Sequence, residues 1–336
     1  MPSIPLYDAD GNQYFVATPG QIRELVDVDL PAAAADAVIS RESWATKTAE
    51  RICAGLRNDG LLIGPFPADD GCGLLILNTD GSLAEFSGNG VAIFSQFLVT
   101  KGDRDRSRTF FVNVHHPRSK PLRVEIEPVQ REGSKEFLIY MNPTFGPEPV
   151  QASVDRFAIN EFNGRAVSRV FALADIDSAW TCSQFVRVGN PHCVTFVKTA
   201  NALPPFGNER SELTDRLTLI AYSSVDGECK GDGLLCENGI NLQWAFVLPP
   251  DESRSIEGSP HILGRVFERG VGWTESSGSS ATAVASAARQ LGVVSDTTVR
   301  VKMPGGSLSV SFAQGDANFE RVRLSREAHL VRFVDF

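Results

Sequence analysis

Two serines in this chain stand where side-chain chemistry would be expected. Ser87 precedes Gly88–Gly90 and Ser277 precedes Gly278–Ser280, and each serine links an apolar strand-like run to a helical pattern. The first amide groups of a helix have no partner within the helix, and the helix dipole adds partial positive charge there. Glycine lets a ligand approach the backbone closely. Two such helix starts facing each other would hold an anion such as a carboxylate.

The serine side chains themselves can be interpreted in two ways. A pair of thiols at such helix starts would have lowered pKa values and could exchange protons with a bound molecule. A serine hydroxyl does not ionise near neutral pH and needs a partner base. Serine is also a favoured residue at the start of a helix. The spacing therefore fits two acid/base positions and two simple helix caps equally well.

Three further residues are candidates for the same site. His192, in "VGNPHCV", follows a turn and begins an apolar strand, a place from which it would project into a cleft. Glu268 and Arg269 precede the second serine turn, as a general base beside a carboxylate clamp or as a strand-end ion pair. A lone histidine is more often structural, and four others have no informative setting: His115, His116, His261 and His329.

Short strand-like runs dominate the elements that must position these residues. Examples are residues 61–63, 74–77, 110–114, 122–126 and 137–140, separated by turn signals. Helical patterns are fewer and are predicted at residues 21–26, 45–56, 90–99, 209–217 and 279–291. Many antiparallel strands with a few helices predict an α+β fold rather than a doubly wound sheet.

The chain reads as two related halves, each with a strand, a turn, a Ser-Gly element and a helix. The helices after Ser87 and Ser277 have too few polar positions to lie on a surface, so both are predicted to be buried. A boundary is expected in Met141–Pro147, which is rich in turn-forming residues. Identity between the halves is too weak to prove a duplication.

Composition excludes several classes of protein. The chain has 336 residues, 42% hydrophobic and 22% charged, which fits a globular protein of two domains. A net charge of −9 disfavours nucleic acid as a partner, and the cationic run Lys101–Arg108 is interrupted by two aspartates and is expected to be a solvated loop. The amino terminus lacks a signal-peptide pattern, and no run approaches the roughly 18 apolar residues of a membrane span. We therefore expect a cytoplasmic protein.

Six scattered cysteines without a C-x-x-C pair indicate reduced, mostly buried thiols rather than a disulfide scaffold or a zinc site. They are Cys53, Cys72, Cys182, Cys193, Cys229 and Cys236.

Five stretches, taken together, resemble the diaminopimelate epimerase family. They are "DGNQYFV", "NTDGSLAEFSGNG", "GNPHCV", "GINLQWAFV" and "ERGVGWTESSGSSATA", in the family's order over most of the chain, and the end "LSREAHLVRFVDF" resembles the family's closing strand. The resemblance implies two similar lobes, each a mixed, mostly antiparallel sheet wrapped around a central helix, with the site between them. The expected lobes are residues 1–145, to which the strand 325–336 returns, and residues 146–324.

The resemblance also implies a role for each matching position. Ser87 and Ser277 fall on the two catalytic cysteines, of which one removes the α-proton and the other delivers a proton to the opposite face. His192 and Glu268 flank the reacting centre. No cofactor is needed. The positions matching substrate-binding residues are the far-end group Asn12, Asn78, Asn190, Asn241, Glu268 and Arg269 and the α-carboxylate group Gly88, Asn89, Gly278 and Ser279.

The chain departs from the family at the two proton-transfer atoms, which are oxygen instead of sulfur. One explanation is a protein with both cysteines replaced by serine so that it holds substrate without turnover. The other is a natural divergence toward a different isomerisation or toward ligand binding. Codons of the native gene at positions 87 and 277 would decide between them. Residues 18–57 also exceed the compact family pattern, and would serve a dedicated pathway or a partner contact.

These observations rank the functions. An amino-acid epimerase scaffold acting on diaminopimelate or a related amino acid comes first, and a cofactor-free isomerase that moves a double bond comes second. A binding protein without catalysis is third. A serine hydrolase is last, because no G-x-S-x-G element is present. The expected partner is a small-molecule amino acid, without metal, nucleic acid or membrane, and a homodimer is left open.

Overall fold

The computed structural model describes residues 2–9, 11–28, 30–79, 81–117, 119–207, 212–223, 231–249, 261–314 and 320–336. The chain divides into two compact units, Met1–Met141 with Leu324–Phe336, and Asn142–Arg323. Both contain mixed sheets and helices, so the predicted α+β class is confirmed. We call them unit 1 and unit 2.

Unit 1 is built on one mixed sheet whose neighbouring strands follow each other in space. Only β2–β3 and β4–β5 are parallel among the pairs of this sheet described here. The order is β19 (His329–Asp335), β1 (Ser3–Ala9), β2 (Asn12–Ala17), β3 (Gly60–Phe66), β4 (Cys72–Leu77), β5 (Phe110–His116), β6 (Ser119–Pro128) and β7 (Glu136–Met141).

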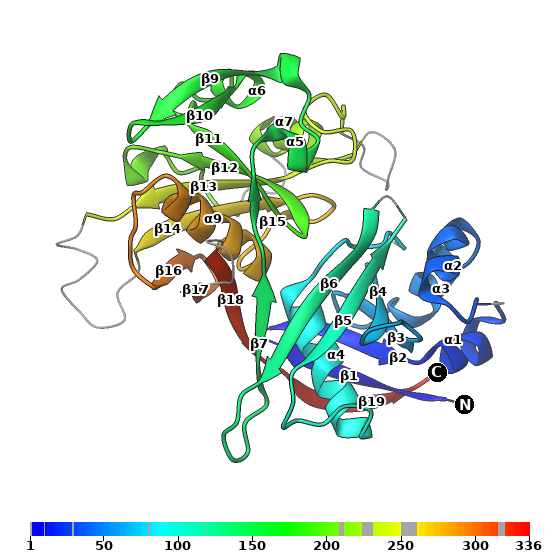
Figure 1. Cartoon of the computed structure of the whole chain (residues 1–336). Coiled ribbons are helices and arrows are strands. Elements are labelled where there is room, and N and C mark those ends of the chain that lie inside the picture. Colours follow the sequence, from blue (N-terminus) through cyan, green and yellow to red (C-terminus); the bar gives the residue numbers. More distant parts are fainter. Residues whose placement is uncertain are drawn as a thin grey trace. The chain divides into compact units, whose positions relative to one another are not determined.

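The helix α4 (Gly88–Lys101) is the centre of unit 1. It packs against β1, β2, β3 and β7, which surround it in Figure 1. Its first seven residues and Ser95, Phe97 and Leu98 are buried, which confirms the burial predicted from its apolar pattern. The helix ends at Gly102, which adopts the left-handed conformation (φ 80°) that favours glycine.

Three helices form the connection between the parallel strands β2 and β3: α1 (Pro19–Val26), α2 (Ala34–Ile39) and α3 (Arg41–Ile52). Parallel neighbours need such a crossover, so much of the 18–57 insert is this connection, and its buried residues join the core beside β3. The sequence placed a helix at 45–56, but α3 ends at Ile52 because Gly55 turns the chain at φ 80°. It missed α2, whose start has no side-chain cap.

Unit 2 repeats the strand plan of unit 1. Its parallel pairs are β12–β13 and β14–β16, and its other described pairs are antiparallel. The order is β9 (Phe157–Phe162), β10 (Arg165–Val170), β11 (Ser183–Val188), β12 (Asn190–Phe196), β13 (Asn241–Val247), β14 (Ile262–Glu268), β16 (Thr298–Met303) and β17 (Gly306–Gln314), with β8 (Thr144–Phe145) beside β11 and β15 (Gly272–Trp273) beside β14.

The helix α9 (Gly278–Gln290) is the counterpart of α4. It packs against β11 to β14 and against β16 and β17, and it is buried from Gly278 to Ala288, as predicted. In both units an antiparallel strand pair is followed along the chain by a parallel pair. The strand that comes after the parallel pair, β4 in unit 1 and β14 in unit 2, then leads toward the buried helix. The shared order supports the two related halves read from the sequence.

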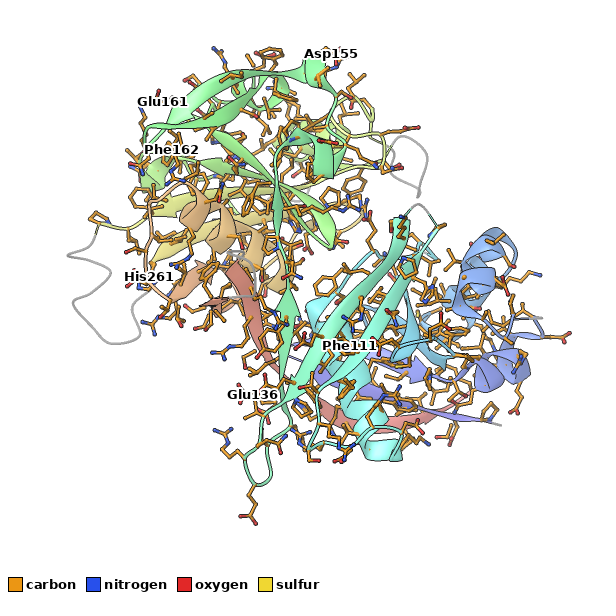
Figure 2. All side chains as sticks on the ribbon, in the orientation of Figure 1. Phe111, Glu136, Asp155, Glu161, Phe162 and His261 are labelled. Atoms are coloured by element: carbon orange, nitrogen blue, oxygen red, sulfur yellow. The ribbon has the colours of Figure 1, made fainter. Side chains whose placement is uncertain are left out.

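The remaining elements are short or cover parts of the sheets. Phe162, labelled in Figure 2, ends β9 and stacks on Phe196 with ring centroids 5.2 Å apart. The helix predicted at 209–217 is α7 (Glu212–Ala221), and residues 209–211 lie outside the described part. The other elements are the helices α5 (Pro147–Val150) and α6 (Phe171–Ala174), the 3₁₀ turns η1 (Val154–Arg156) and η2 (Ala200–Ala202), and the strand β18 (Glu320–Glu327).

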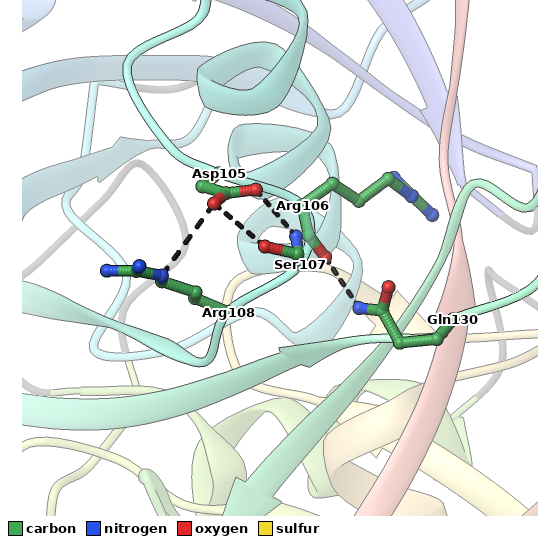
Figure 3. Close-up of polar contacts among 5 residues, drawn as sticks. All are labelled: Asp105, Arg106, Ser107, Arg108 and Gln130. Atoms are coloured by element: carbon green, nitrogen blue, oxygen red, sulfur yellow. Dashed lines mark hydrogen bonds and ion pairs between the residues drawn. The ribbon is translucent and has the colours of Figure 1, made fainter.

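The charged loop after α4 compensates its own charge, as Figure 3 shows. The Asp105 carboxylate accepts hydrogen bonds from the Ser107 backbone N–H and hydroxyl, both at 2.8 Å, and lies 3.8 Å from Arg108 Nε. These bonds to Ser107 lower the pKa of Asp105. The Arg106 carbonyl accepts from Gln130 Nε2 at 2.6 Å. The prediction of a solvated loop holds at Asp105, Ser107 and Arg108, whereas Arg106 is half-buried over the Phe137 ring.

The thiols behave as the sequence indicated. The five described cysteines are free and buried, and Cys229 lies outside the described residues. Burial raises the pKa of Cys193 and Cys236 to about 12, which leaves them unreactive as thiolates. No helix in the described ranges is long and apolar enough to cross a membrane.

Candidate functional site

The two candidate serines have the same local geometry. Each lies one residue before its helix in an extended backbone, with φ −143° at both Ser87 and Ser277. Ser87 Oγ accepts the Gly90 N–H at 3.0 Å, and Ser277 Oγ accepts the Ser280 N–H at 3.3 Å. Both side chains therefore satisfy a helix-start amide that the helix itself leaves unbonded.

A polar group of unit 1 surrounds the start of α4. The Tyr14 hydroxyl lies 3.4 Å from Ser87 Oγ. Asn89, which is 8% exposed, donates its Nδ2 hydrogen to Asn12 Oδ1, and its own Oδ1 accepts from Arg326 Nε at 2.8 Å. The structure thus brings Asn12 and Asn89 together, as two positions of the predicted site.

Asn78 is held in a separate turn of unit 1. It follows β4, and its Nδ2 donates to Ser82 Oγ at 2.9 Å, while its carbonyl accepts the Gly81 N–H. Its carboxamide is therefore engaged by Ser82, not by the Asn12–Asn89 pair, in this structure.

His192 lies inside unit 2, on β12 opposite Asn241 of the parallel strand β13. We predicted from its place after a turn that it projects into a cleft, but the side chain is fully buried, with 0% exposed. Helix α9 packs against β12, and Gln243 bonds both His192 and Ser280 of that helix, so this face of the strand is covered. Burial, followed by the charges of Arg269 and Arg187, lowers the pKa of His192 to about 3, so the ring is neutral at neutral pH.

A hydrogen-bonded chain connects His192 to the Glu268 carboxylate. Gln243 Nε2 lies 2.9 Å from His192 Nδ1 and donates to Ser280 Oγ at 3.1 Å. Ser280 Oγ in turn donates to Glu268 Oε1 at 3.4 Å, and Thr274 Oγ1 donates to Glu268 Oε2 at 3.2 Å. Because the amide nitrogen only donates, His192 Nδ1 accepts, and the ring carries its proton on Nε2.

The remaining predicted residues of unit 2 lie on the same elements. Asn241, at the start of β13, accepts the Arg269 backbone N–H on its Oδ1 at 2.9 Å. The Arg269 guanidinium donates to the Asn238 carbonyl at 2.6 Å. Ser279 Oγ lies 3.4 Å from Ser277 Oγ in the buried first turn of α9, and Asn190 begins β12, where it pairs with Val188.

Sequence reasoning missed five participants. Tyr14 and Gln243 lie inside stretches already quoted for the resemblance, and Ser280 and Thr274 flank Ser277 within six residues, so their polar character was a usable signal. Arg326 lies in the quoted closing stretch as well, but its contact with Asn89 spans 237 residues of the chain and could not be read from that stretch.

The chemistry available to the serines is limited by these partners. The described hydrogen bonds of Ser277 Oγ go to Ser280 N and Ser279 Oγ, and neither His192 nor Glu268 is bonded to it. A serine base needs a directly bonded proton acceptor. Among the described residues, no group of three His, Cys, Asp or Glu side chains could hold a metal ion.

Comparisons with known proteins find similar chains. No family model matches the chain. The chain is 29% identical to diaminopimelate epimerase 2 of Nostoc sp., over 76% of this chain and 74% of that protein. It is 27% identical to the diaminopimelate epimerase of Methanocella arvoryzae, over 81% of each chain.

Solved structures share the fold at much lower identity. A hydroxyproline epimerase from Agrobacterium vitis has a TM-score of 0.59 at 11% identity, over 99% of this chain and 91% of that one. A phenazine biosynthesis protein of the PhzF family from Bacillus anthracis has a TM-score of 0.56 at 12% identity, over 100% and 99%. The relatives and the fold together support an epimerase or isomerase. By sequence over most of its length, and by fold, the chain is a distant homologue of the diaminopimelate epimerases.

Proposed function

We propose that the chain is a cofactor-independent amino-acid epimerase of the diaminopimelate epimerase type, in a form that binds its substrate and barely turns it over. Ser87 and Ser277 occupy the two proton-transfer positions. Gly88, Asn89, Gly278 and Ser279 receive the α-carboxylate of the amino acid. Asn12, Asn78, Asn190, Asn241, Glu268 and Arg269 hold its far end.

One observation carries the proposal. Both serines stand at the starts of buried helices with the same backbone geometry. We take both to match the catalytic thiol positions of the family, on the resemblance of the flanking sequences. The helix starts supply amides and partial positive charge for a carboxylate whether the side chain is serine or cysteine. Binding is therefore retained on replacing sulfur by oxygen, whereas proton transfer is not.

The serine form lacks a strong enough base. The α-proton of an amino acid is very weakly acidic, and its removal needs a base on one face and a proton donor on the other. A thiol with an ordinary pKa of about 8.5 can be tuned to give thiolate at neutral pH. The serine hydroxyls bond helix amides and other hydroxyls, which do not take up a proton.

The decisive test restores sulfur at both positions. Ser87→Cys and Ser277→Cys are made together, and deuterium uptake from solvent at the α-carbon is followed alongside the change in optical rotation of LL-diaminopimelate. The double variant should exchange and epimerise, and the unaltered chain should be nearly inert. Fast turnover by the unaltered chain would refute the proposal and point to a serine-based isomerase.

Binding is tested separately from turnover. Arg269→Ala should weaken diaminopimelate binding by on the order of 2 kcal/mol, because a charge-assisted bond is lost. Calorimetric titration of the unaltered chain and the variant measures it. Equal affinity in the two proteins would place the ligand elsewhere.

A double-bond isomerase is the second candidate, because in the described part of the chain neither serine hydroxyl is hydrogen-bonded to a carboxylate or imidazole that would make it a strong base. Asn78→Ala and Asn241→Ala separate the two. An epimerase site loses amino-acid binding in both variants, whereas an isomerase of a plain diacid tolerates them.

A further inference from the structure

The amides of Asn89 and Asn12 form a directed chain that begins at a buried arginine. Arg326, 5% exposed, donates from Nε to Asn89 Oδ1 at 2.8 Å and from Nη1 to the Ser325 carbonyl. Asn89 Nδ2 then donates to Asn12 Oδ1. All three side chains belong to unit 1, although Arg326 comes from the Leu324–Phe336 segment.

The arginine decides which way both amides point. A guanidinium has donors and no acceptor, so only the oxygen of Asn89 can face it. The nitrogen of Asn89 must then face Asn12, and a nitrogen donor can be received only by the oxygen of Asn12. Asn12, which is half-buried, therefore directs its own N–H donors away from Asn89.

We infer that Arg326 is a positioning residue that fixes the Asn89–Asn12 pair so that Asn12 offers N–H donors to the second carboxylate of a dicarboxylic amino acid. The inference rests on the proposed function and adds a residue that sets the specificity of its far-end site. Without the arginine both side-chain amide groups can flip, so that Asn12 presents its oxygen as readily as its nitrogen. A carboxylate is repelled by the oxygen of a side-chain amide and is bound by the N–H groups of that amide.

The donors of Asn12 distinguish ligands by their far end. A far end without a carboxylate gains nothing from these donors. Diaminopimelate carries the second carboxylate, and lysine is the same skeleton without it.

The test compares these two probes on the serine protein, so that turnover does not enter. Arg326→Met removes the donor and keeps much of the side-chain length. Arg332→Met is the matched control, because it removes the same charge from an exposed position of β19. Calorimetry gives the ratio of lysine to diaminopimelate dissociation constants for each protein, and thermal unfolding gives its stability.

We expect Arg326→Met to reduce the preference for diaminopimelate over lysine at least about tenfold, as for loss of a hydrogen bond to a charged group. Arg332→Met should keep the preference. A variant that is damaged only in its fold loses affinity for both ligands equally. That outcome leaves the ratio of dissociation constants unchanged and overturns the inference, while the proposed function stands. If the unaltered chain binds neither ligand, the proposed function fails first.

A second variant keeps the test decisive if Arg326→Met does not fold. Asn12→Asp retains an oxygen that accepts from Asn89 Nδ2 and replaces the outward N–H donors with a negative oxygen. Its melting temperature should stay near that of the unaltered chain, and its preference for diaminopimelate over lysine should fall by roughly tenfold or more. Retention of the preference would show that Asn12 does not donate to the second carboxylate.

Discussion

The starts of α4 and α9 have one backbone geometry and two different polar surroundings. The third residue after the serine is Gly90 in α4 and Ser280 in α9. Tyr14 and His192 also occupy matching places, because each lies two residues after the asparagine that begins its strand and on the strand that pairs in parallel with the next. Tyr14 approaches the serine directly, whereas His192 reaches Glu268 through Gln243 and Ser280.

The comparison of the two helix starts shows which features come from the repeated fold and which belong to one half alone. Both halves supply a capped helix start that suits a carboxylate. Unit 1 adds a buried cation and amides of fixed direction, and unit 2 adds a buried neutral histidine chained to a carboxylate. In the proposed function, anion binding rests on a feature that both halves have, and proton transfer rests on features that differ between them.

The largest expected effect is on the rate of epimerisation when only one of the two halves carries a thiol. Ser87→Cys alone and Ser277→Cys alone should each epimerise diaminopimelate at least about 100-fold more slowly than the double variant, because one proton-transfer group is missing. A single thiol works on one face, so each variant should take up deuterium in a different stereoisomer. Mass spectrometry of LL- and meso-diaminopimelate after incubation in heavy water measures this. The same isomer labelled by both variants would contradict two opposed faces.

The next effect is a pH dependence of stability that His192 should give to unit 2. His192 has a folded pKa of about 3, below its ordinary value, so the unfolded chain binds more protons as pH falls. The stabilisation is complete above about pH 6.5 and is lost toward pH 3 at up to about 1.4 kcal/mol per pH unit. Urea unfolding followed by tryptophan fluorescence reports it, since three of the four tryptophans, Trp180, Trp244 and Trp273, lie in unit 2.

His192→Gln should remove this slope, and His329→Gln, at an exposed position, should retain it. The difference between the two variants cancels the contribution of the carboxylates. An identical slope in both would mean that His192 titrates normally in the folded protein.

A smaller effect tests the third helix position, where the halves differ. Ser280→Ala should destabilise unit 2 by about 1–3 kcal/mol, because Gln243 loses an acceptor and Glu268 loses a donor. Ser286→Ala is the control within α9, since its buried hydroxyl oxygen has no hydrogen-bond partner in the described structure. That variant should be neutral or stabilising in urea unfolding. An equal loss of stability in the two variants would show that Ser280 does not connect Gln243 to Glu268 by hydrogen bonds.

The smallest effect is expected at Tyr14. Its 3.4 Å contact with Ser87 is long for a hydroxyl pair, so Tyr14→Phe should cost less than about 1 kcal/mol. In a Ser87→Cys background, the same change should raise the thiol pKa by less than about one unit, measured from thiolate absorbance against pH. A larger rise would make Tyr14 an acid/base partner and would bring the two halves closer in function.

The sequence predicted the parts of this comparison that depend on local pattern. α4 and α9 were placed within about two residues of their ends because apolar residues run all round them and a serine and glycine start them. The serine caps followed from the same residues. α3 was displaced because its start at Arg41 has no side-chain cap to mark it.

The polar partners of the site depend on contacts distant in sequence. Gln243 reaches His192 across 51 residues and Arg326 reaches Asn89 across 237. A glutamine in a buried strand and an arginine in a closing strand carry no local pattern that announces such contacts. The burial of His192 was likewise missed, since it depends on α9, a helix more than 80 residues later in the chain, packing against β12.

The pairing of β19 with β1 sets an order of events during synthesis. Ser3 pairs with Asp335, and the segment Leu324–Phe336 is translated after the whole of Asn142–Arg323. The ribosome therefore releases all of unit 2 before unit 1 receives its last strand, and β1 keeps an unpaired edge until then. Arg326 arrives in that same late segment. A nascent chain that has not reached residue 326 has both serine helices and no arginine to orient Asn89.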